Sequence, residues 1–508
     1  MANEPSFAQL IQKGYTFKGP AFTIGGAMLD KAVVKDCTVR IPLKTLNRHG
    51  LISGATGTGK TKTLQLISEG LSEAGIPVLM MDIKGDLSGI AAPGDSSDEG
   101  LKKRSALIGL QYTPRGFPVE LLSLSAQPGV RLRATISEFG PILLARMLDL
   151  NDTQSGLLAI LFQYCDDHKL PLIDLKDLKA LLTFATGTGK EALEKSYGHI
   201  SSASVGAILR KLVALEQQDA DLFFGETSFD IADLMQTDQK GNGKINIVRL
   251  TDIQDRPGLF STFMLSLLSE LYATLPEAGD LDKPKLILFL DEAHLIFQEA
   301  GKALLQKLES IIKLIRSKGV GIFFCTQNPT DIPDDILSQL GFKVQHALRA
   351  FTAKDRKAIK QTAENYPLTP FYQTDQLLTE LGIGEALITL LNEKGIPTPL
   401  VHTLLCAPRS RMDILSDSEI KQLIDESKLV AKYAETVDAE SAYELLQKRM
   451  AGEEDRLDNA KPTIKKRESS PSMFEEFLHS SVGRQVGRTA ASILVRSLLG
   501  TLGLGRRR

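Results

Sequence analysis

The sequence of 508 residues is poor in cysteine, has no long apolar run and carries no excess of positive charge. Its four cysteines are far apart and form no CxxC pair, which argues against a zinc site and a disulfide framework. They are Cys37, Cys165, Cys325 and Cys406. No apolar stretch approaches the roughly 20 residues that a membrane-spanning helix needs. The first residues also lack the basic and apolar regions of a signal peptide, so we expect a cytoplasmic protein.

The formal net charge is −2, whereas domains that bind nucleic acid usually carry a clear positive excess. Any contact with DNA therefore has to come from local basic loops or from an assembled oligomer. The hydrophobic content of 43% and the charged content of 24% are ordinary for a soluble globular protein. Since single domains usually hold roughly 100–200 residues, we expect two or three structural units.

Changes of pattern divide the chain into five segments. Residues 1–45 contain short strand-like runs and turns, and residues 46–129 open an α/β core with a strand, a helix and a strand in succession. Residues 130–235 have apolar residues at helical spacing, which predicts a mostly helical insertion. Strands return in residues 236–411, the second part of the core. Residues 412–508 are predicted to form a charged helical region, a flexible linker and a basic tail.

Short apolar runs in the two core segments predict buried strands. Because helices alternate with several of them, we expect a largely parallel sheet. The runs are residues 50–53, 76–82, 245–250, 285–290, 321–325 and 343–347, with a further pair at 385–389 and 400–403.

A glycine-rich loop follows the first of these strands and precedes a helix. Its residues match the pattern GxxxxGK[ST] at every fixed position: Gly54, Ala55, Thr56, Gly57, Thr58, Gly59, Lys60 and Thr61. Glycines let the loop turn so that its N–H groups face phosphates, and the helix N-terminus adds partial positive charge. We expect Lys60 to contact the β- and γ-phosphates of ATP and the Thr61 hydroxyl to ligate Mg²⁺. We also place Thr63 among the nucleotide-binding residues.

Two carboxylates, Asp291 and Glu292, end a second apolar strand. We expect Asp291, at the exposed end of that strand, to hold the Mg²⁺ shell and Glu292 to polarise the attacking water. The next strand is followed by Thr326 and Gln327. We predict that Gln327 senses the γ-phosphate or the attacking water, the alternative being that it caps a helix or turn.

Residues 185–190 repeat the letters of residues 55–60 without forming a second site. Phe184 stands where the first glycine is needed, and Glu191 stands where the Mg²⁺-binding hydroxyl is needed. A carboxylate at that position repels phosphate, so we predict a turn between helices.

Taken together, these residues resemble the HerA/FtsK group of RecA-like ring ATPases, and within it the bacterial proteins with a HerA-type C-terminal domain. The resemblance covers roughly residues 20–410. It is carried by residues 48–54 before the loop, 82–87 after the second strand, Asp291-Glu292, residues 316–321, Thr326-Gln327 and residues 384–386.

The resemblance implies an ATP-hydrolysing, RecA-like P-loop core that assembles into a hexameric ring, with each nucleotide at a subunit boundary. Arg316 matches the position of a family arginine finger, a solvated arginine at a helix end being the alternative. Lys318 and Arg349 are weaker candidates. Asp82 resembles an acidic position near the Mg²⁺ site.

Two basic segments leave their roles open. Residues 102–104, Lys-Lys-Arg, form either a pore-facing basic loop or a solvated surface. The final segment, with Arg484, Arg488, Arg496 and residues 506–508, is expected to bind an anionic membrane or nucleic acid, to dock on a partner or subunit, or to be disordered.

Three functions are consistent with the sequence. The first is an ATP-driven motor that acts on DNA, as a translocase or helicase. The second is an ATPase of the same fold that remodels protein or powers a membrane-associated complex. The third is a nucleotide-dependent oligomeric scaffold, which the intact pair of Asp291 and Glu292 counts against.

Overall fold

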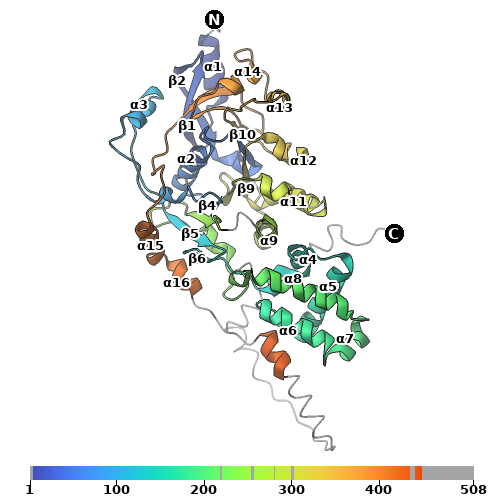
Figure 1. The fold of residues 1–508 in the computed structure, drawn as a ribbon. Coiled ribbons are helices and arrows are strands. Elements are labelled where there is room, and N and C mark those ends of the chain that lie inside the picture. The colour runs from blue at the N-terminus through green and yellow to red at the C-terminus, as the bar shows by residue number, and fades with distance from the viewer. Residues whose placement is uncertain are drawn as a thin grey trace, which may run out of the picture.

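The computed structural model describes residues 4–217, 220–252, 257–279, 281–298, 302–434 and 441–448. Figure 1 shows an α/β body with a separate bundle of helices beside it. The predicted linker at 452–472 and the basic segment that ends at Arg508 lie outside the described residues. In the described part of the chain, no helix is both long and apolar enough to cross a membrane.

A single sheet of twelve strands forms the core, in the order β2-β1-β12-β11-β10-β3-β9-β8-β4-β7-β5-β6. The eight strands from β10 to β6 are mutually parallel, which confirms the predicted α/β class with a largely parallel sheet. They are β10 (Phe342–Gln345), β3 (Gly50–Ser53), β9 (Val320–Thr326), β8 (Leu286–Leu290), β4 (Val78–Asp82), β7 (Ile245–Arg249), β5 (Val119–Ser123) and β6 (Val130–Arg131).

The other four strands extend one edge of the sheet in antiparallel fashion. They are β11 (Glu385–Thr389), β12 (Val401–Leu405), β1 (Ala21–Leu29) and β2 (Ala32–Pro42). The expectation of only strands and turns in residues 1–45 is wrong at its start, because α1 (Glu4–Gly14) is a helix. Its buried Phe7 and Ile11 lie one turn apart and pack into the core.

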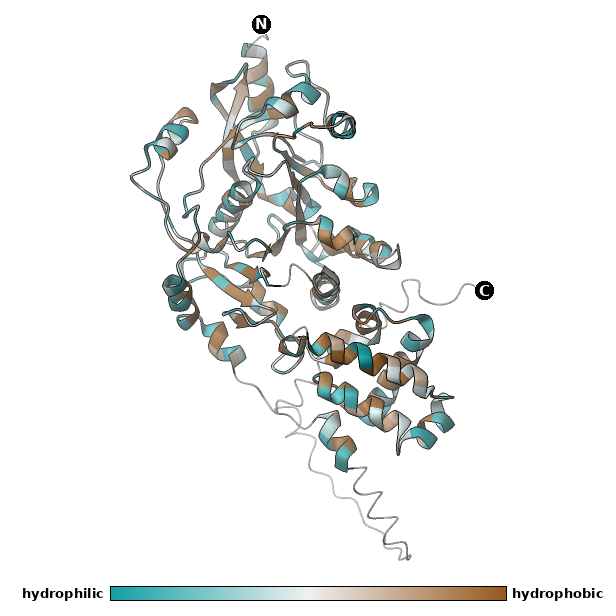
Figure 2. Cartoon of the chain, in the orientation of Figure 1, coloured by the Kyte–Doolittle hydropathy of each residue, from teal (hydrophilic) through white to brown (hydrophobic). Residues whose placement is uncertain are grey.

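Side chains that alternate along the parallel strands enter two different hydrophobic clusters. In β8, Leu286, Leu288 and Leu290 join one cluster, whereas Ile287 and Phe289 join the other. Helices α1 and α2 (Lys60–Glu73) cover the second face. The first face is covered by α9 (Pro257–Thr274), α10 (His294–Gln298), α11 (Lys302–Ile315) and α12 (Asp334–Leu337). The strands are therefore apolar on both faces, and in Figure 2 several of them are brown.

Five helices form the bundle beside the sheet: α4 (Ile136–Met147), α5 (Asp152–His168), α6 (Leu175–Thr186), α7 (Lys190–Tyr197) and α8 (Ser202–Glu216). The same hydrophobic cluster runs from the sheet through α9 into this bundle, so the bundle and the core share buried surface. The remaining labelled α-helices are α3 (Glu99–Leu107), α13 (Ala353–Glu364), α14 (Thr374–Glu380), α15 (Asp417–Asp425) and α16 (Lys428–Ala434). Residues 442–448 are also helical.

A buried histidine joins three elements at the start of β3. His49 Nε2 lies 2.8 Å from the carbonyl oxygen of Ile312 in α11, and Nδ1 accepts the backbone N–H of Ile322 in β9 at 3.0 Å. This pairing fixes a neutral ring whose proton is on Nε2. Burial lowers the pKa of His49 to about 4; the Ile312 carbonyl opposes this shift and the charge of Arg316 adds to it.

We expect His49 to make the fold sensitive to acid. In the unfolded chain a histidine takes up a proton below pH about 6.5, whereas folded His49 resists it until about pH 4. Stability therefore falls as pH drops through this window, by up to roughly 3 kcal/mol. His49→Gln removes this contribution, so urea unfolding between pH 7 and pH 5 should show a shallower pH dependence than in the wild type. Equal slopes in the two proteins would contradict this assignment.

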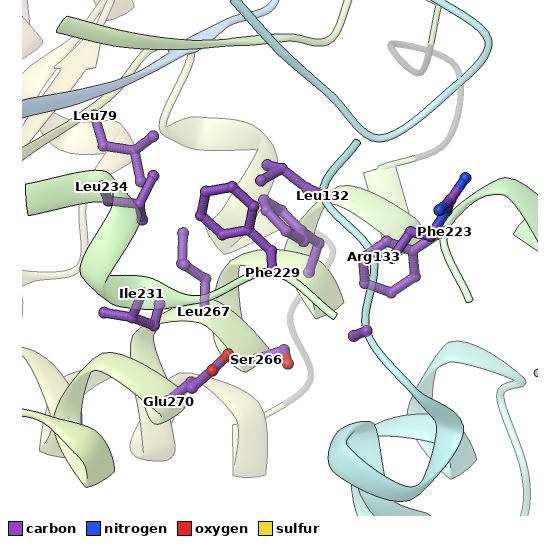
Figure 3. A pocket seen from close by; sticks show the side chains of 12 residues that line it. Leu79, Leu132, Arg133, Phe223, Phe229, Ile231, Leu234, Ser266, Leu267 and Glu270 are labelled. Atoms are coloured by element: carbon purple, nitrogen blue, oxygen red, sulfur yellow. The ribbon is translucent and has the colours of Figure 1, made fainter. Parts of the chain in front are cut away.

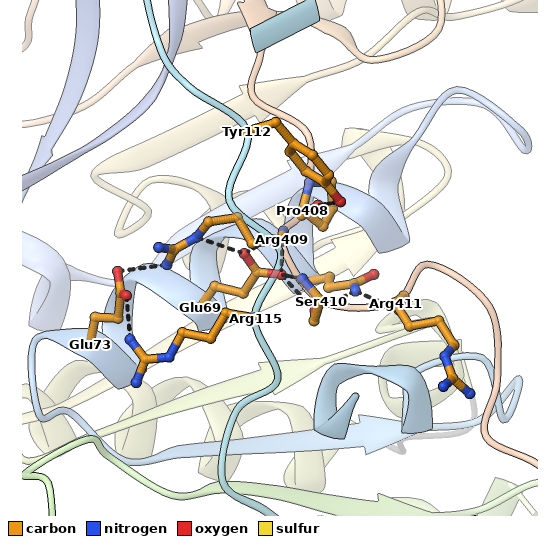
Figure 4. A network of polar contacts seen from close by, with 9 residues as sticks. Glu69, Glu73, Tyr112, Arg115, Pro408, Arg409, Ser410 and Arg411 are labelled. Carbon is orange, nitrogen blue, oxygen red and sulfur yellow. Dashed lines mark hydrogen bonds and ion pairs between the residues drawn. The ribbon is translucent and has the colours of Figure 1, made fainter. Parts of the chain in front are cut away.

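The polar face of α2 holds the segment that follows β12 (Figure 4). Buried Glu69 accepts the backbone N–H groups of Arg409 and Ser410 and the Ser410 hydroxyl, at 2.6–3.1 Å. At the surface, Glu73 pairs with Arg409 and Arg115 at 2.6 and 2.7 Å. Burial raises the pKa of Glu69, although these hydrogen bonds oppose the shift. The helix is thereby tied to a segment some 340 residues away in the chain.

Glu69→Ala should destabilise the core by about 3 kcal/mol, because two backbone donors and one hydroxyl lose their buried acceptor. Glu73→Ala is the matched control: it removes half-exposed ion pairs, each worth about 0–1 kcal/mol. Urea unfolding of both variants measures the difference. A Glu69 variant as stable as the Glu73 variant would show that the buried carboxylate does not anchor α2.

Candidate nucleotide-binding site

The glycine-rich loop joins the carboxyl end of β3 to the first turn of α2. Gly54, Gly57 and Gly59 have φ of 151°, 77° and 109°, a region that favours glycine. At Gly54 a Cβ would also lie 2.5 Å from the Cβ of His346, whereas at Gly57 it would meet nothing within 4 Å. The backbone conformation of this loop is thus set by its glycines, and at Gly54 also by a neighbouring strand.

Lys60 is buried at the start of α2. Its Nζ donates to the carbonyl oxygens of Gly54 and Ala55 at 2.7 and 3.1 Å, so the ammonium lies within the loop. Burial and then the charge of Lys84 lower the pKa of Lys60, while Glu292 and Asp291 act in the opposite direction.

Below the loop lies a buried layer of polar side chains. Thr63 Oγ1 and His346 Nε2 are 2.8 Å apart. Ser53 donates to Gln345 Oε1 at 2.6 Å. Burial and then the charge of Lys60 lower the pKa of His346 to about 4. Thr63, which we predicted to bind nucleotide, is thus turned toward β10. Thr61 is half-buried at the mouth of the loop.

The two predicted carboxylates follow β8, two strands away from β3. Asp291 and Glu292 are both buried, so the expectation of an exposed strand end is wrong for Asp291. Burial raises the pKa of Asp291 to about 6, although the charge of Lys84 opposes this. Glu292 has φ of 46°, an uncommon and strained backbone region for a residue other than glycine.

One residue of the site escaped sequence reasoning. Lys84 Nζ lies 2.5 Å from Glu292 Oε1, and His294 Nδ1 lies 3.2 Å from the other oxygen, Oε2. Burial lowers the pKa of Lys84, but Asp291 and Glu292 outweigh it and raise the pKa overall. In the sequence, Lys84 stood only as a member of the segment 82–87 that carries the family resemblance, two residues after the strand that ends at Asp82.

Asp82 closes the turn that carries Lys84. Its carboxylate accepts the backbone N–H groups of Gly85, Asp86 and Leu87 at 2.7–3.3 Å. Burial and then Asp86 raise the pKa of Asp82 to about 6. The hydrogen bonds of this carboxylate therefore go to the turn, whereas the sequence resemblance placed it near Mg²⁺.

Gln327 is exposed and directly follows β9, which lies between β3 and β8. Because carboxyl ends of parallel strands share one edge, Gln327 lies between the loop and the two carboxylates. The preceding Thr326 donates to Asp331 Oδ2 at 2.7 Å and its carbonyl accepts the Gly54 N–H at 3.3 Å.

The three candidates for the arginine finger lie at different places in the fold. Arg316 is exposed in a short 3₁₀ turn just before β9, at the sheet edge opposite the loop of its own chain. Lys318 pairs with Glu277 at 3.0 Å and lies over the ring of Tyr272. Arg349 is exposed at the same edge as the loop and donates to the Thr379 carbonyl at 3.2 Å.

Two further sequence features have clear places in the fold. Residues 102–104 lie on helix α3, which corrects the suggested basic loop, and Arg104 donates to the carbonyl oxygens of Gly384 and Leu405. In the second GTGK string, residues 187–189 lie between α6 and α7 and Lys190 begins α7, which confirms a turn between helices.

A hollow of about 40 Å³ is lined by residues of β4, of α9 and of the segments 132–134 and 223–234 (Figure 3). It shares Arg133, Phe229 and Glu270 with a neighbouring cavity of about 330 Å³. Neither is lined by the glycine-rich loop or by Asp291 and Glu292, so both are separate from the predicted site.

The residues at the sheet edge suit Mg²⁺ bound together with a nucleotide. Among the described residues, no group of three or more His, Cys, Asp or Glu is placed to hold a metal by itself. Mg²⁺ usually takes one or two carboxylates, with water and phosphate oxygens filling the other positions. Asp291, buried and with a raised pKa, and the hydroxyl of Thr61 fit that ligand set.

Comparison with models of protein families decides to which family the chain belongs. The model of the helicase HerA-like C-terminal family matches residues 28–508. The chain belongs to this family. The resemblance drawn from the sequence is thereby confirmed, and the chain is a member of a family of HerA-like P-loop ATPases.

Several curated proteins are similar to this HerA-like chain. The DNA double-strand break repair helicase HerA of Sulfolobus acidocaldarius is 22% identical over 383 residues, 74% of this chain and 69% of that protein. Its namesake from Saccharolobus solfataricus is 23% identical over 368 residues, 72% and 66% of the two chains. The DNA import protein CedB of Sulfolobus acidocaldarius is 25% identical over 363 residues, which are 70% of this chain and 52% of that protein. The HerA-like chain thus spans about two thirds of the first two relatives.

A solved structure supports the assigned fold. The bacterial conjugative coupling protein TrwBΔN70 superposes with a TM-score of 0.50 at 13% identity, over 80% of this chain and 94% of that one. A TrwB structure in complex with ADP and Mg²⁺ has a TM-score of 0.49 at 14% identity, over 80% and 94% of the chains.

Gly57→Ala should weaken ATP binding without unfolding the HerA-like chain. An alanine at a left-handed φ costs about 1–2 kcal/mol, which corresponds to roughly five- to thirtyfold in affinity. Gly156→Ala in α5 is the control, since a Cβ meets nothing within 4 Å at either glycine and only Gly57 has positive φ. Titration with a fluorescent ATP analogue measures both. An unchanged affinity for Gly57→Ala would disprove a role for this conformation in binding.

Proposed function

We propose that the protein is an Mg²⁺-dependent ATPase motor that acts on DNA as a ring of subunits. One observation carries the catalytic part: β9 lies between β3 and β8, so the glycine-rich loop, Gln327 and the pair Asp291-Glu292 meet at one edge of the sheet. The DNA part rests on the relatives, whose names describe a DNA repair helicase and a DNA import protein.

In the proposed reaction, Lys60 contacts the β- and γ-phosphates of ATP. Glu292 takes up a proton from a water, whose oxygen attacks the γ-phosphorus. The bond from that phosphorus to the bridging oxygen breaks, and ADP and inorganic phosphate leave. Gln327 orients the water or contacts the γ-phosphate. Thr61 and Asp291 hold Mg²⁺, which supplies neutralising charge at the phosphate oxygens.

The proposed ring explains the position of Arg316. It lies at the edge opposite its own loop, so it acts only on the nucleotide of a neighbouring subunit. Such fingers contribute about 10³–10⁵ in rate in well-studied enzymes.

Glu292→Gln should lower ATP turnover by about 10²–10⁴-fold while ATP still binds, because an amide cannot take up the proton of the water. The measurement is phosphate release by the purified protein, alone and with double- or single-stranded DNA. Stimulation by DNA that the variant loses supports the motor. Turnover that depends on Glu292 but ignores DNA favours an ATPase that acts on protein or at a membrane. If the wild-type protein shows no turnover, the result favours the nucleotide-dependent oligomeric scaffold.

Mixing two inactive variants tests whether Arg316 is an arginine finger that acts between subunits. Arg316→Ala subunits keep a complete site, and Glu292→Gln subunits keep the finger. Turnover should therefore reappear when the two are mixed and allowed to assemble. Mixtures as inactive as their components would exclude Arg316 as a finger acting between subunits.

A further inference from the structure

The side chain proposed to activate water is held by an ion pair. Lys84 Nζ lies 2.5 Å from Glu292 Oε1, while the second oxygen faces His294 at 3.2 Å. That second oxygen is buried and makes no hydrogen bond of standard geometry. A carboxylate committed to an ammonium in this way is a weaker hydrogen-bond acceptor for water than a free one.

The position of Lys84 follows from the sheet. Strand β4 pairs with β8, with Met81 opposite Leu290, so the residues after each strand meet at the same edge. The turn after β4 is fixed by the hydrogen bonds from Gly85, Asp86 and Leu87 to Asp82. Its backbone is therefore held, while the long side chain of Lys84 crosses to the end of β8.

The two partners differ in exposure. The Lys84 side chain is 40% exposed and that of Glu292 is 8% exposed. A lysine is a point charge on a flexible stem, so Lys84 can leave the pair toward solvent, whereas Glu292 stays buried. Asp291 and Asp86 also attract Lys84, and Lys60 is the other cation near it. The pair is thus a breakable contact at the centre of the site.

We propose that Lys84 is a positioning residue that restrains Glu292, so that basal hydrolysis is slow until the Lys84 side chain moves toward solvent and breaks the ion pair. This inference rests on the proposed ATPase function. Lys84 does not bind the reacting atoms itself; it acts through the carboxylate of Glu292.

Turnover of four variants tests the restraint. Lys84→Gln should raise basal turnover by about three- to tenfold, the effect expected from removing one partly exposed ion pair. Lys84→Arg keeps the charge and should stay near the wild-type rate. The double variant K84Q/E292Q should have no turnover, which shows that the gain works through Glu292. Lys179→Gln is the matched control, because it removes an ion pair of 2.5 Å to Glu216 within the helical bundle.

Thermal unfolding without nucleotide gives a second reading. Lys84→Gln leaves a buried carboxylate beside Asp291 without its cation, so it should lower the melting temperature. In K84Q/E292Q the melting temperature should be partly restored. If the ion pair between Lys84 and Glu292 only stabilises the fold, the melting temperatures show this coupling but Lys84→Gln does not raise turnover.

The outcomes separate this inference from the proposed function. Wild-type turnover that Glu292→Gln abolishes supports the ATPase whatever Lys84→Gln does. If Lys84→Gln then turns over ATP at or below the wild-type rate, the proposed restraint is wrong but the ATPase function stands. The same holds if the shifts in melting temperature of Lys84→Gln and Glu292→Gln simply add up in the double variant. A complete absence of turnover in the wild type and in Lys84→Gln overturns both.

Discussion

The parallel alignment of β3, β9 and β8 is the constraint on which the site depends. Strand β3 precedes β8 and β9 by more than 200 residues in the chain, yet all three end at one edge because they run side by side in this order. In the sheet order, each strand from β3 to β5 has buried apolar side chains in both clusters, so these strands cannot slide without exposing apolar side chains. The loop and the carboxylates are therefore held in place by the core beneath them.

The site is assembled from groups that lower the stability of the fold. Asp82 and Asp291 are buried carboxyls with raised pKa, Glu292 has a left-handed backbone, and Lys60 is a buried ammonium. Each has partial compensation close by: backbone donors for Asp82, carbonyl oxygens for Lys60 and an ion pair for Glu292. Buried charges of this kind are usual where phosphate and metal ions bind.

The last part of the described chain connects the core with the helical bundle. After β12 the chain passes along α2, where Glu69 binds Ser410. It then reaches β5, where Ser427 donates to Glu120 at 2.6 Å. At the bundle, the backbone N–H of Tyr443 donates to Asp177 at 2.8 Å. The helix that follows the glycine-rich loop and the bundle thus contact a common C-terminal segment.

The sequence alone determined the local features: the glycine-rich loop, the apolar strand before Asp291 and the false second site, because each is set by a few adjacent residues. It missed α1 and β5. Nor did it identify Lys84 as a partner of Glu292, or His346 beneath the loop. Those contacts join residues roughly 200 and 280 positions apart. Local periodicity carries no information on which strand lies beside which, since strand order is decided by burial of both sheet faces in the whole fold.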